Sequence, residues 1–342
     1  MAQLIVLTPN PAVDVTYRVP AFDVGATVRV SQVQRRPGGK GLNVVRVLRT
    51  LGEEAVAVLP LGGSAGRWVA SMMDEEHHAC EVVTVDGETR STVAIVDPVG
   101  HPTLFSEPGP ALSPAEGDRL IEATVKHCEP GCVVVVSGSL PRGVDADWVG
   151  RLVRAVRGAG ARVLVDTSGP ALVAAARAGA DLLKPNAAEA IEAMEAELGT
   201  PGHEPVPAPP ASPDIGDNRL PPKPVRNVDG RSGGTRLRQA VQYLQSLGAS
   251  TVVVSQGADG LIAFSPDHDL ITQRAVRGVT GNPTGAGDAA TAGLALAWAR
   301  GESMETALRQ AAVLGAAAVK QPTAGEVDLA DVRAFDQQLS AD

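Results

Sequence analysis

The chain has 342 residues, of which 44% are hydrophobic but only 3% aromatic, so a sizeable core must be built from alanine, valine and leucine. Its net charge of −9 excludes a general nucleic-acid binder, which would need a basic balance or a basic stripe. No apolar run approaches the ~20 residues of a membrane span. The N-terminus does not resemble a signal peptide, and the three cysteines are therefore expected to be reduced thiols. We therefore expect a cytoplasmic protein without nucleic-acid or membrane partners.

Short apolar runs alternate with helix-like stretches along most of the chain. The runs predict strands at Leu4–Thr8, Val56–Pro60, Val133–Ser137, Val163–Asp166, Asp181–Leu183 and Val252–Ser255. The intervening stretches predict helices at Asn43–Leu51, Ser64–His77, Pro114–His127, Asp145–Gly158, Pro170–Ala178, Ala187–Glu197 and Thr235–Leu247. Two later Ala-rich windows, Ala292–Ala299 and Ala311–Val319, predict buried helices. This alternation favours an α/β fold with a mainly parallel sheet covered on both faces.

Two β-rich segments and one proline-rich segment interrupt this rhythm. Ala12–Val33 and Glu88–Phe105 alternate without helices between their strands, which predicts a small antiparallel sheet. We expect it to form a lid, built from about residues 12–33 and 88–107, over the edge of the main sheet. Residues 199–234 carry nine of the 26 prolines and little apolar content, which indicates a flexible surface insertion between two helices. Residues 1–342 are accordingly expected to form a single domain.

The most informative segment is the glycine-rich run from Gly281 to Asp288, which leads into an apolar, Ala-rich helix. Free backbone N–H groups and the helix dipole create an anion site at such a helix start, and glycine allows close approach. A carboxylate beside this site would repel a permanently bound phosphate. It suits a phosphoryl group in transit, with Asp288 facing the attacking hydroxyl. The helix dipole favours the ionised form, so Asp288 is expected to be ionised at neutral pH.

Other interpretations of the glycines must be considered. The string Gly285-x-Gly287-x-x-Ala290 fits a relaxed dinucleotide fingerprint, but that fingerprint follows an apolar strand, whereas Gly-Asn-Pro-Thr precedes it here. A glycine turn that starts a helix is the simplest alternative. A P-loop is excluded, because Gly38-Gly39-Lys40-Gly41 lacks both the upstream glycine spacing and the Ser or Thr after lysine.

Several further motifs resemble those of the ribokinase-like (PfkB-type) carbohydrate kinases. The family's N-terminal signature is resembled by Arg36-Pro-Gly-Gly-Lys-Gly-Leu-Asn43. Its C-terminal signature is resembled by Asn282-Pro-Thr-Gly-Ala-Gly-Asp288, and its metal-associated motif by Lys184-Pro-Asn186-x-x-Glu189. Two more strings, Thr8-Pro-Asn-Pro-Ala-Val-Asp14 and Ser137-Gly-Ser-Leu-Pro141, resemble the phosphofructokinase branch, close to 1-phosphofructokinase and tagatose-6-phosphate kinase. The resemblance covers nearly the whole chain outside residues 199–234, and the order of several motifs makes it specific.

The resemblance implies a three-layer αβα sandwich with a small β lid, and ATP-dependent phosphorylation of a sugar or sugar-phosphate hydroxyl. It assigns the anion hole to Gly285, Ala286 and Gly287 and the catalytic base to Asp288. It places the acceptor among Asp14, Arg29, Gly38, Gly39, Lys40, Asn43, Arg90 and Ser139. The planar fork of Arg90 is the best candidate for binding the acceptor's phosphate, with Arg29 and Lys40 as second candidates. For Asn43, a plain helix cap remains an alternative.

The same resemblance places ATP near Lys184, Asn186, Ser255, Gly257, Gly260 and Thr284. It implies Mg²⁺ held by Asn186 and Glu189 through water, because magnesium keeps several waters and takes few protein ligands. A helix-terminal carboxylate is the alternative for Glu189, and a simple turn for the glycines after Ser255.

The sequence thus predicts a Mg²⁺- and ATP-dependent kinase of a phosphorylated ketohexose, converting fructose 1-phosphate to fructose 1,6-bisphosphate. The alternatives are a 6-phosphofructokinase or tagatose-6-phosphate kinase, a nucleoside kinase of the same fold, a non-catalytic sugar-phosphate sensor, and a nicotinamide-dependent oxidoreductase. Exposed strand edges in the lid would suit a homodimer formed through it.

Overall fold

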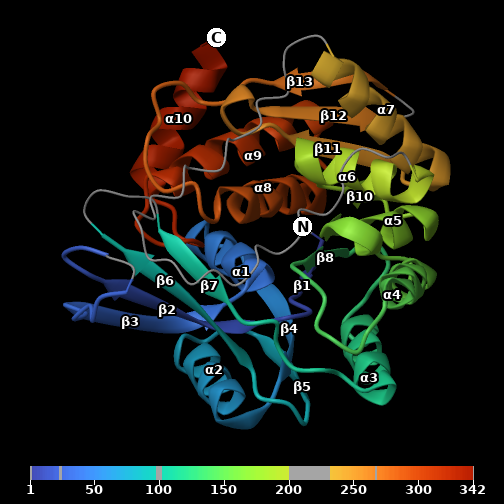
Figure 1. The fold of residues 1–342 in the computed structure, drawn as a ribbon. Helices are drawn as coiled ribbons and strands as arrows, with labels where there is room; N and C mark the ends of the chain where they lie inside the picture. Colours follow the sequence, from blue (N-terminus) through green and yellow to red (C-terminus); the bar gives the residue numbers. More distant parts are fainter. Residues whose placement is uncertain (1, 23–24, 98–101, 200–231, 266–267, 342) are drawn as a thin grey trace.

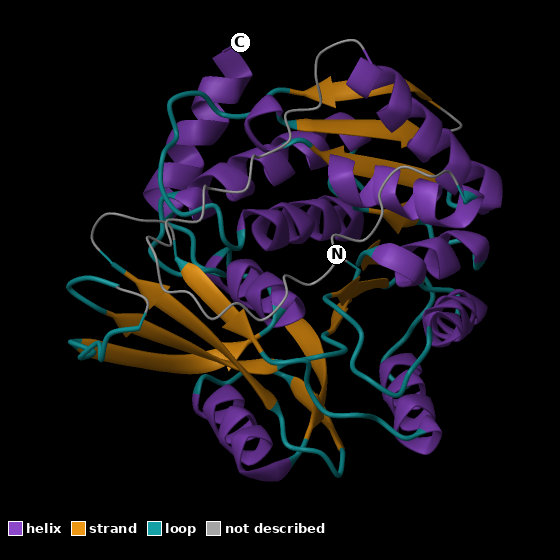
Figure 2. Ribbon diagram, viewed as in Figure 1, coloured by secondary structure: helices purple, strands orange, loops and turns teal. Residues whose placement is uncertain are grey.

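The computed structural model describes residues 2–22, 25–97, 102–199, 232–265 and 268–341. Most of the predicted insertion lies outside these ranges, and its last residues already belong to a helix that begins at Ser232. Within the described residues, a large central sheet lies between two layers of helices, and a second, smaller sheet stands beside it (Figures 1 and 2). None of the described helices combines the length and the apolar character that a bilayer crossing requires.

The central sheet has the strand order β13-β12-β11-β10-β9-β8-β1-β4-β5. Its strands are β1 (Leu4–Leu7), β4 (Ala55–Leu61), β5 (Cys80–Thr84), β8 (Val133–Ser137), β9 (Arg162–Asp166), β10 (Leu182–Leu183), β11 (Thr251–Ser255), β12 (Leu261–Ser265) and β13 (His268–Gln273). All neighbours pair in parallel except β12 and β13, which add an antiparallel edge. Every residue of β1 and β8 is buried, because helices cover both faces of the sheet there.

Helices pack on each face of this sheet. One face is covered by α1 (Lys40–Thr50), α2 (Gly63–Glu75), α8 (Ala286–Arg300) and α9 (Met304–Val319), with α10 (Leu329–Ala341) packed on α9. The other face is covered by α3 (Pro114–Val125), α4 (Ala146–Gly158), α5 (Gly169–Arg177), α6 (Ala187–Leu198) and α7 (Ser232–Leu247). The predicted α/β fold with a mostly parallel sheet is confirmed.

Small residues decide how closely α8 and α9 approach. A side chain at Gly293 of α8 would place its Cβ 2.8 Å from the backbone nitrogen of Ala311 on α9, which is closer than atoms can pack. Alanine and glycine on the facing sides therefore let the two helix backbones pack almost directly on each other. Both Ala-rich windows are buried helices, as their composition predicts.

The smaller sheet has the order β3-β2-β6-β7. Its strands are β2 (Ala12–Arg18), β3 (Gln32–Gly38), β6 (Arg90–Val96) and β7 (Thr103–Ser106). The predicted second sheet is present, but the prediction that it is antiparallel is wrong for its central pair, because β2 and β6 run parallel. The reason lies in the main sheet: β2 follows β1 and β6 follows β5, and β1 and β5 point in the same direction (Figure 1).

Candidate active site

The candidate site lies where α8 begins. Gly285 precedes the helix with a left-handed backbone (φ +87°), and a side chain there would bring its Cβ within 2.6 Å of the Cβ of Ala324. The first N–H groups of a helix have no intrahelical acceptor. That of Ala286 donates to the carbonyl of Pro283 over 3.2 Å, which leaves those of Gly287 and Asp288 as the donors for an anion. No strand leads into α8 from the residues before it, so the dinucleotide interpretation lacks its required context.

Asp288 lies in the first turn of α8 and is only 6% exposed. Its Oδ2 accepts a hydrogen bond of 2.7 Å from Nδ2 of Asn43. Burial, together with the negative charge of Asp166, raises the pKa of Asp288 to about 7. The expectation of a fully ionised carboxylate at neutral pH is therefore wrong: the helix dipole is weak compared with desolvation inside the protein.

A buried ion cluster lies next to Asp288 and was not predicted. Asp166, at the carboxyl end of β9, is fully enclosed and pairs with Lys184 (Oδ2 to Nζ, 3.2 Å) and Lys40 (Oδ1 to Nζ, 3.4 Å). It also accepts a hydrogen bond of 2.7 Å from Thr291 of α8. Burial opposes ionisation, but Lys184 and Lys40 outweigh it and hold the pKa of Asp166 below its usual value. The sequence signal was an aspartate at the end of a strand in a parallel sheet, where ligands commonly bind.

The two lysines bring positive charge to the start of α8. The Nζ of Lys184 lies 3.7 Å from the position that a Cβ on Gly287 would take, so the ammonium group is beside the glycine-rich loop. Asp166 raises the pKa of Lys40, so this ammonium group stays charged at neutral pH. Lys40, a second candidate for binding the acceptor's phosphate, pairs with Asp166 and lies close enough to Asp288 for their charges to interact.

A second wall of the candidate site is formed by Asp14 on β2, by Gly38 at the end of β3 and by Gly39 after it. The carboxylate of Asp14 sits against Gly38, and any side chain at Gly38 would overlap it, so close packing requires glycine there. The N–H of Gly39 donates to Asp14, and burial raises the pKa of Asp14 despite the nearby Arg36. α1 begins at Lys40 with Gly39 as its N-cap, so the alternative that Asn43 is a plain helix cap is wrong.

The two arginines predicted to bind the acceptor's phosphate differ in their surroundings: Arg90 is hydrogen-bonded to backbone, whereas Arg29 is exposed. Arg90 on β6 donates from Nε and Nη2 to the carbonyl of Asn10, each over 3.2 Å, and from Nη1 to that of Glu107 over 3.0 Å. The guanidinium group of Arg90 therefore uses three of its hydrogen bonds on backbone carbonyls. Arg29 lies exposed in the segment between β2 and β3. Ser139 follows β8 and accepts a 3.4 Å hydrogen bond from Asn10, a buried residue that sequence reasoning did not single out.

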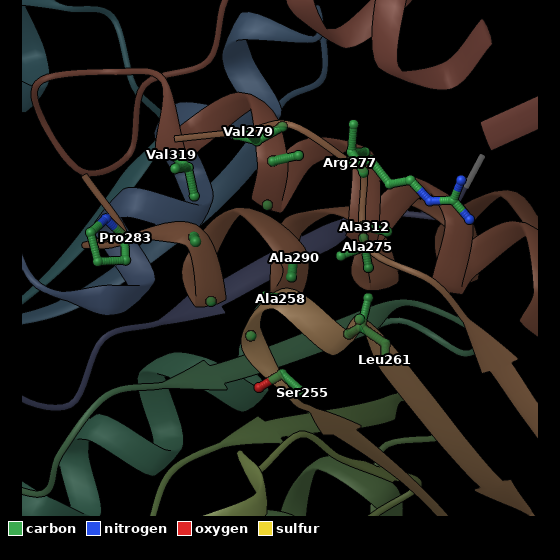
Figure 3. Close-up of a pocket in the computed structure, with 18 of the residues that line it drawn as sticks. Ser255, Ala258, Leu261, Ala275, Arg277, Val279, Pro283, Ala290, Ala312 and Val319 are labelled. Carbon is green, nitrogen blue, oxygen red and sulfur yellow. The ribbon is translucent and has the colours of Figure 1, made fainter. Parts of the chain in front are cut away.

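A cavity of about 640 Å³ opens on the other side of the glycine-rich loop (Figure 3). Four predicted ATP residues line it: Asn186, Ser255, Gly257 and Gly260. Its walls also include Val276, Ala290, Ala312 and Gly315, small or apolar residues that were not predicted and that suit a flat, apolar ring. Thr284 is not among the lining residues; its N–H donates to Asn282 over 3.0 Å and shapes the loop.

Asn186 and Glu189 cap helix α6. The side chain of Asn186 accepts from the N–H of Glu189 over 2.9 Å, and Glu189 accepts from the N–H of Asn186 over 2.8 Å. This reciprocal capping box is the structural role that the sequence left open as an alternative. Both side chains carry hard oxygen atoms: Asn186 lines the cavity, and the charge of Glu189 helps to raise the pKa of Lys40. Such a sparse oxygen set fits a Mg²⁺ ion that keeps most of its waters.

Known proteins resemble this chain in sequence and in fold. The sequence matches the pfkB family of carbohydrate kinases over residues 7–211 and 226–330. Phosphofructokinase-2 from Escherichia coli, in a structure with potassium, is 28% identical and superposes with a TM-score of 0.83 over 99% of this chain and 100% of that one. Another structure of that enzyme, with fructose 6-phosphate, gives a TM-score of 0.81 at 28% identity over the same shares of the two chains.

More distant proteins share the fold. A Thermotoga maritima protein described as a possible 1-phosphofructokinase is 23% identical, with a TM-score of 0.76 over 98% of each chain. Arabidopsis thaliana ribokinase, complexed with ribose and ATP, is 20% identical, with a TM-score of 0.67 over 98% of this chain and 99% of that chain. The chain belongs to the PfkB family of carbohydrate kinases, a family that uses ATP, and its fold is ribokinase-like.

Proposed function

We propose that this kinase transfers the γ-phosphoryl group of ATP to the C6 hydroxyl of fructose 1-phosphate and so forms fructose 1,6-bisphosphate. The observation that carries the proposal is the position of Asp288, which is held by Asn43 at the start of α8 beside two lysines. A buried carboxylate next to an anion site suits a hydroxyl that loses its proton while it attacks a phosphoryl group.

In this mechanism Asp288 accepts the proton of the acceptor hydroxyl. Its pKa of about 7 lies close to a neutral working pH, where a base is both sufficiently ionised and sufficiently basic. Asp14, across the site, orients the sugar through its hydroxyls, and the bare backbone at Gly38 and Gly39 lets the sugar approach closely.

The transferring phosphoryl group meets the N–H groups at the start of α8, together with the ammonium groups of Lys184 and Lys40. Asp166 holds both lysines in place, so their charge is already oriented before the reaction begins. Asn186 and Glu189 would hold Mg²⁺, which neutralises the charge of the ATP phosphates when it is bound. The apolar cavity beside Ser255 would take the adenine ring.

The choice of fructose 1-phosphate rests on the Gly-Gly-Lys-Gly sequence at Lys40. Fructose 6-phosphate is the second candidate, because a neighbour with 28% identity is a phosphofructokinase-2 whose structure contains that sugar. The two acceptors give the same product, fructose 1,6-bisphosphate, and differ only in which end of the sugar enters the site.

An assay of ADP release with Mg-ATP tests the proposal. The panel contains fructose 1-phosphate, fructose 6-phosphate, tagatose 6-phosphate, fructose and ribose, and Asp288→Asn serves as the inactive control. We expect the highest kcat/KM with fructose 1-phosphate. A preference for an unphosphorylated sugar would contradict the acceptor class but not the kinase. Ligand binding by folded protein without turnover of any acceptor would instead favour a sensor.

Replacing Arg90 with alanine is expected to raise KM for the phosphorylated acceptor by about tenfold or more, with a smaller change for fructose, because a charge-assisted hydrogen bond to phosphate is lost. Arg142→Ala is the matched control: Nε of Arg142 donates to the carbonyl of Gly109 over 3.1 Å, so it also holds backbone next to Glu107. Steady-state kinetics on both sugars measure the effect. Equal KM values for Arg90→Ala and wild type, or equal increases in the two variants, would remove Arg90 from the phosphate site.

The small sheet is expected to act as a lid and to pair with its counterpart in a homodimer. The strand register places Val33 and Phe105 on one face of the sheet, where they are 46% and 54% exposed. Exposed apolar residues on a sheet with open edges favour association. Light scattering should give twice the chain mass of 35.1 kDa for wild type and the single mass for Phe105→Lys. Leu270→Lys, at an exposed position of β13, is the control that should remain dimeric. A monomeric wild-type protein would contradict this prediction.

A further inference from the structure

Arg46 lies one helical turn beyond Asn43 on α1, beneath the acceptor side of the site. Its Nη1 donates a 3.0 Å hydrogen bond to Oδ1 of Asn43, and its Nη2 donates to the carbonyl of Pro37, next to Gly38. Burial lowers the pKa of Arg46 to about 10, so the guanidinium remains charged at neutral pH. Arg46 is not among the site residues expected from the sequence, and it has no place in the mechanism given above.

The contact with Arg46 determines which way the Asn43 amide points. A guanidinium group has only hydrogen-bond donors, so it must face the oxygen of a carboxamide and not its NH₂ group. The oxygen of Asn43 is thereby turned to Arg46, and the NH₂ group is turned to Asp288, 2.7 Å away. An amide that donates to a carboxylate favours the ionised form, whereas a flipped amide would accept from the protonated form.

Gly325 covers this hydrogen bond from the opposite side. A Cβ on Gly325 would lie 2.7 Å from Oδ1 of Asn43 and 2.8 Å from Nη1 of Arg46. The segment that carries Gly325 is held on β3 by Arg36, which donates to the carbonyl of Ala324 and pairs with Glu326 over 2.8 Å. Only a residue without a side chain allows this backbone to pack directly on the Asn43–Arg46 contact.

We propose that Arg46 is a positioning residue, which orients the Asn43 carboxamide so that its NH₂ group, and not its oxygen, faces the Asp288 carboxylate. The proposal rests on the proposed role of Asp288 as the base. The charged groups that act directly on Asp288 are Asp166 from β9, Lys40 from α1 and Lys184 after β10. Arg46 acts on Asp288 through the Asn43 amide.

The test measures the pKa of Asp288 in the free protein by NMR, with ¹³C-labelled aspartate carboxyl groups and Asp288→Asn to assign the signal. Loss of the orienting donor in Arg46→Met should raise the pKa of Asp288 by about one unit, which is about a tenfold change in its proton affinity. The control Arg49→Met removes a cation from the same helix, one that donates to the carbonyl of Glu76 and not to Asn43. It should leave the pKa unchanged.

Two further variants keep the test decisive. Arg46→Lys retains a group that can only donate, so the pKa of Asp288 should stay near the wild-type value. Gly325→Ala pushes on the hydrogen bond from the other side and should raise the pKa even if Arg46→Met does not fold. An unchanged pKa in a folded Arg46→Met or Gly325→Ala protein, or an equal rise in Arg49→Met, would overturn the proposal.

The same variants separate this inference from the proposed function. The NMR titration needs neither ATP nor an acceptor, so it gives its result even if the sugar has been assigned wrongly. If Asp288 is the base, the acidic limb of kcat/KM against pH should move upward in Arg46→Met in parallel with the NMR value. If the pKa of Asp288 measured by NMR shifts but the acidic limb of the pH profile does not move, the orienting role of Arg46 is upheld and the assignment of Asp288 as the base is contradicted.

Discussion

Asp288→Asn is expected to lower kcat by a factor of about 10²–10⁴ while the KM values for ATP and acceptor change little. The amide fits the same space and can still face Asn43, but it cannot take the proton of the attacking hydroxyl. Steady-state kinetics under saturating Mg-ATP measure the loss. The control is Asp181→Asn, which changes a carboxylate at the start of β10 that pairs with Arg157 away from the site. Retention of kcat in Asp288→Asn would show that another group accepts the proton.

The same substitution is expected to stabilise the fold above neutral pH. The native pKa of Asp288, about 7, lies above the value of 3.8 for an unpaired aspartate, so the native state holds a proton that the unfolded chain releases first. The wild-type protein therefore loses stability as pH rises from about 4 to about 7, by up to about 4 kcal/mol. Thermal unfolding at pH 8 should show a higher Tm for Asp288→Asn, and at pH 4 the difference should vanish. If wild type and Asp288→Asn had the same Tm at pH 8 as well as at pH 4, the raised pKa of Asp288 would be contradicted.

Asp166→Asn is expected to destabilise the fold by about 3–5 kcal/mol, because it leaves Lys184 as a buried ammonium group without its anion. The loss of a negative neighbour should also lower the pKa of Asp288, so any remaining activity should extend to lower pH. Chemical denaturation measures the first effect and the pH profile of kcat the second.

The matched comparison for Asp166→Asn is again Asp181→Asn. Asp181 is part-exposed, and its contact with Arg157 is 3.4 Å long, so the change should cost about 1 kcal/mol or less. If the two variants were equally stable, the cluster of Asp166, Lys40 and Lys184 would have no special role in holding the site together.

Much of the fold could be predicted because the parallel strands are buried on both faces. Continuous apolar runs such as Val133–Ser137 are typical of strands in the middle of a parallel sheet that helices cover on both faces. The direction of β2 against β6 could not be predicted from alternation, since a period of two is the same for parallel and antiparallel neighbours. The edge strands β5 and β13 were also missed, because their mixed composition reflects partial exposure.

The candidate site could be proposed from the sequence where a backbone requirement coincided with chemistry. Glycine at 285 and 287 followed by Asp288 indicates an anion site from sequence alone. Asp166 was missed because its role depends on a neighbour far away in sequence: its contact with Lys40 spans 126 positions. Arg46 was missed although its partner Asn43 is only three positions away, because the importance of that contact depends on Asp288, 245 positions from Asn43. The ionisation of Asp288 was mispredicted for the same reason, since burial is a property of the whole fold.

The long-range contacts of Asp288 also bear on how the protein is made. Asn43 and Asp288 are 245 positions apart, and Gly325, which covers their neighbour Arg46, comes later still. On the ribosome, the acceptor side of the site emerges long before the residues that complete it, and such distant pairings form late in folding. The residues of β1, β4 and α1 are made before Asp288, the proposed base. We therefore expect phosphoryl transfer to begin only when α8 and the segment after α9 have docked on the N-terminal half, so unfinished copies cannot consume ATP.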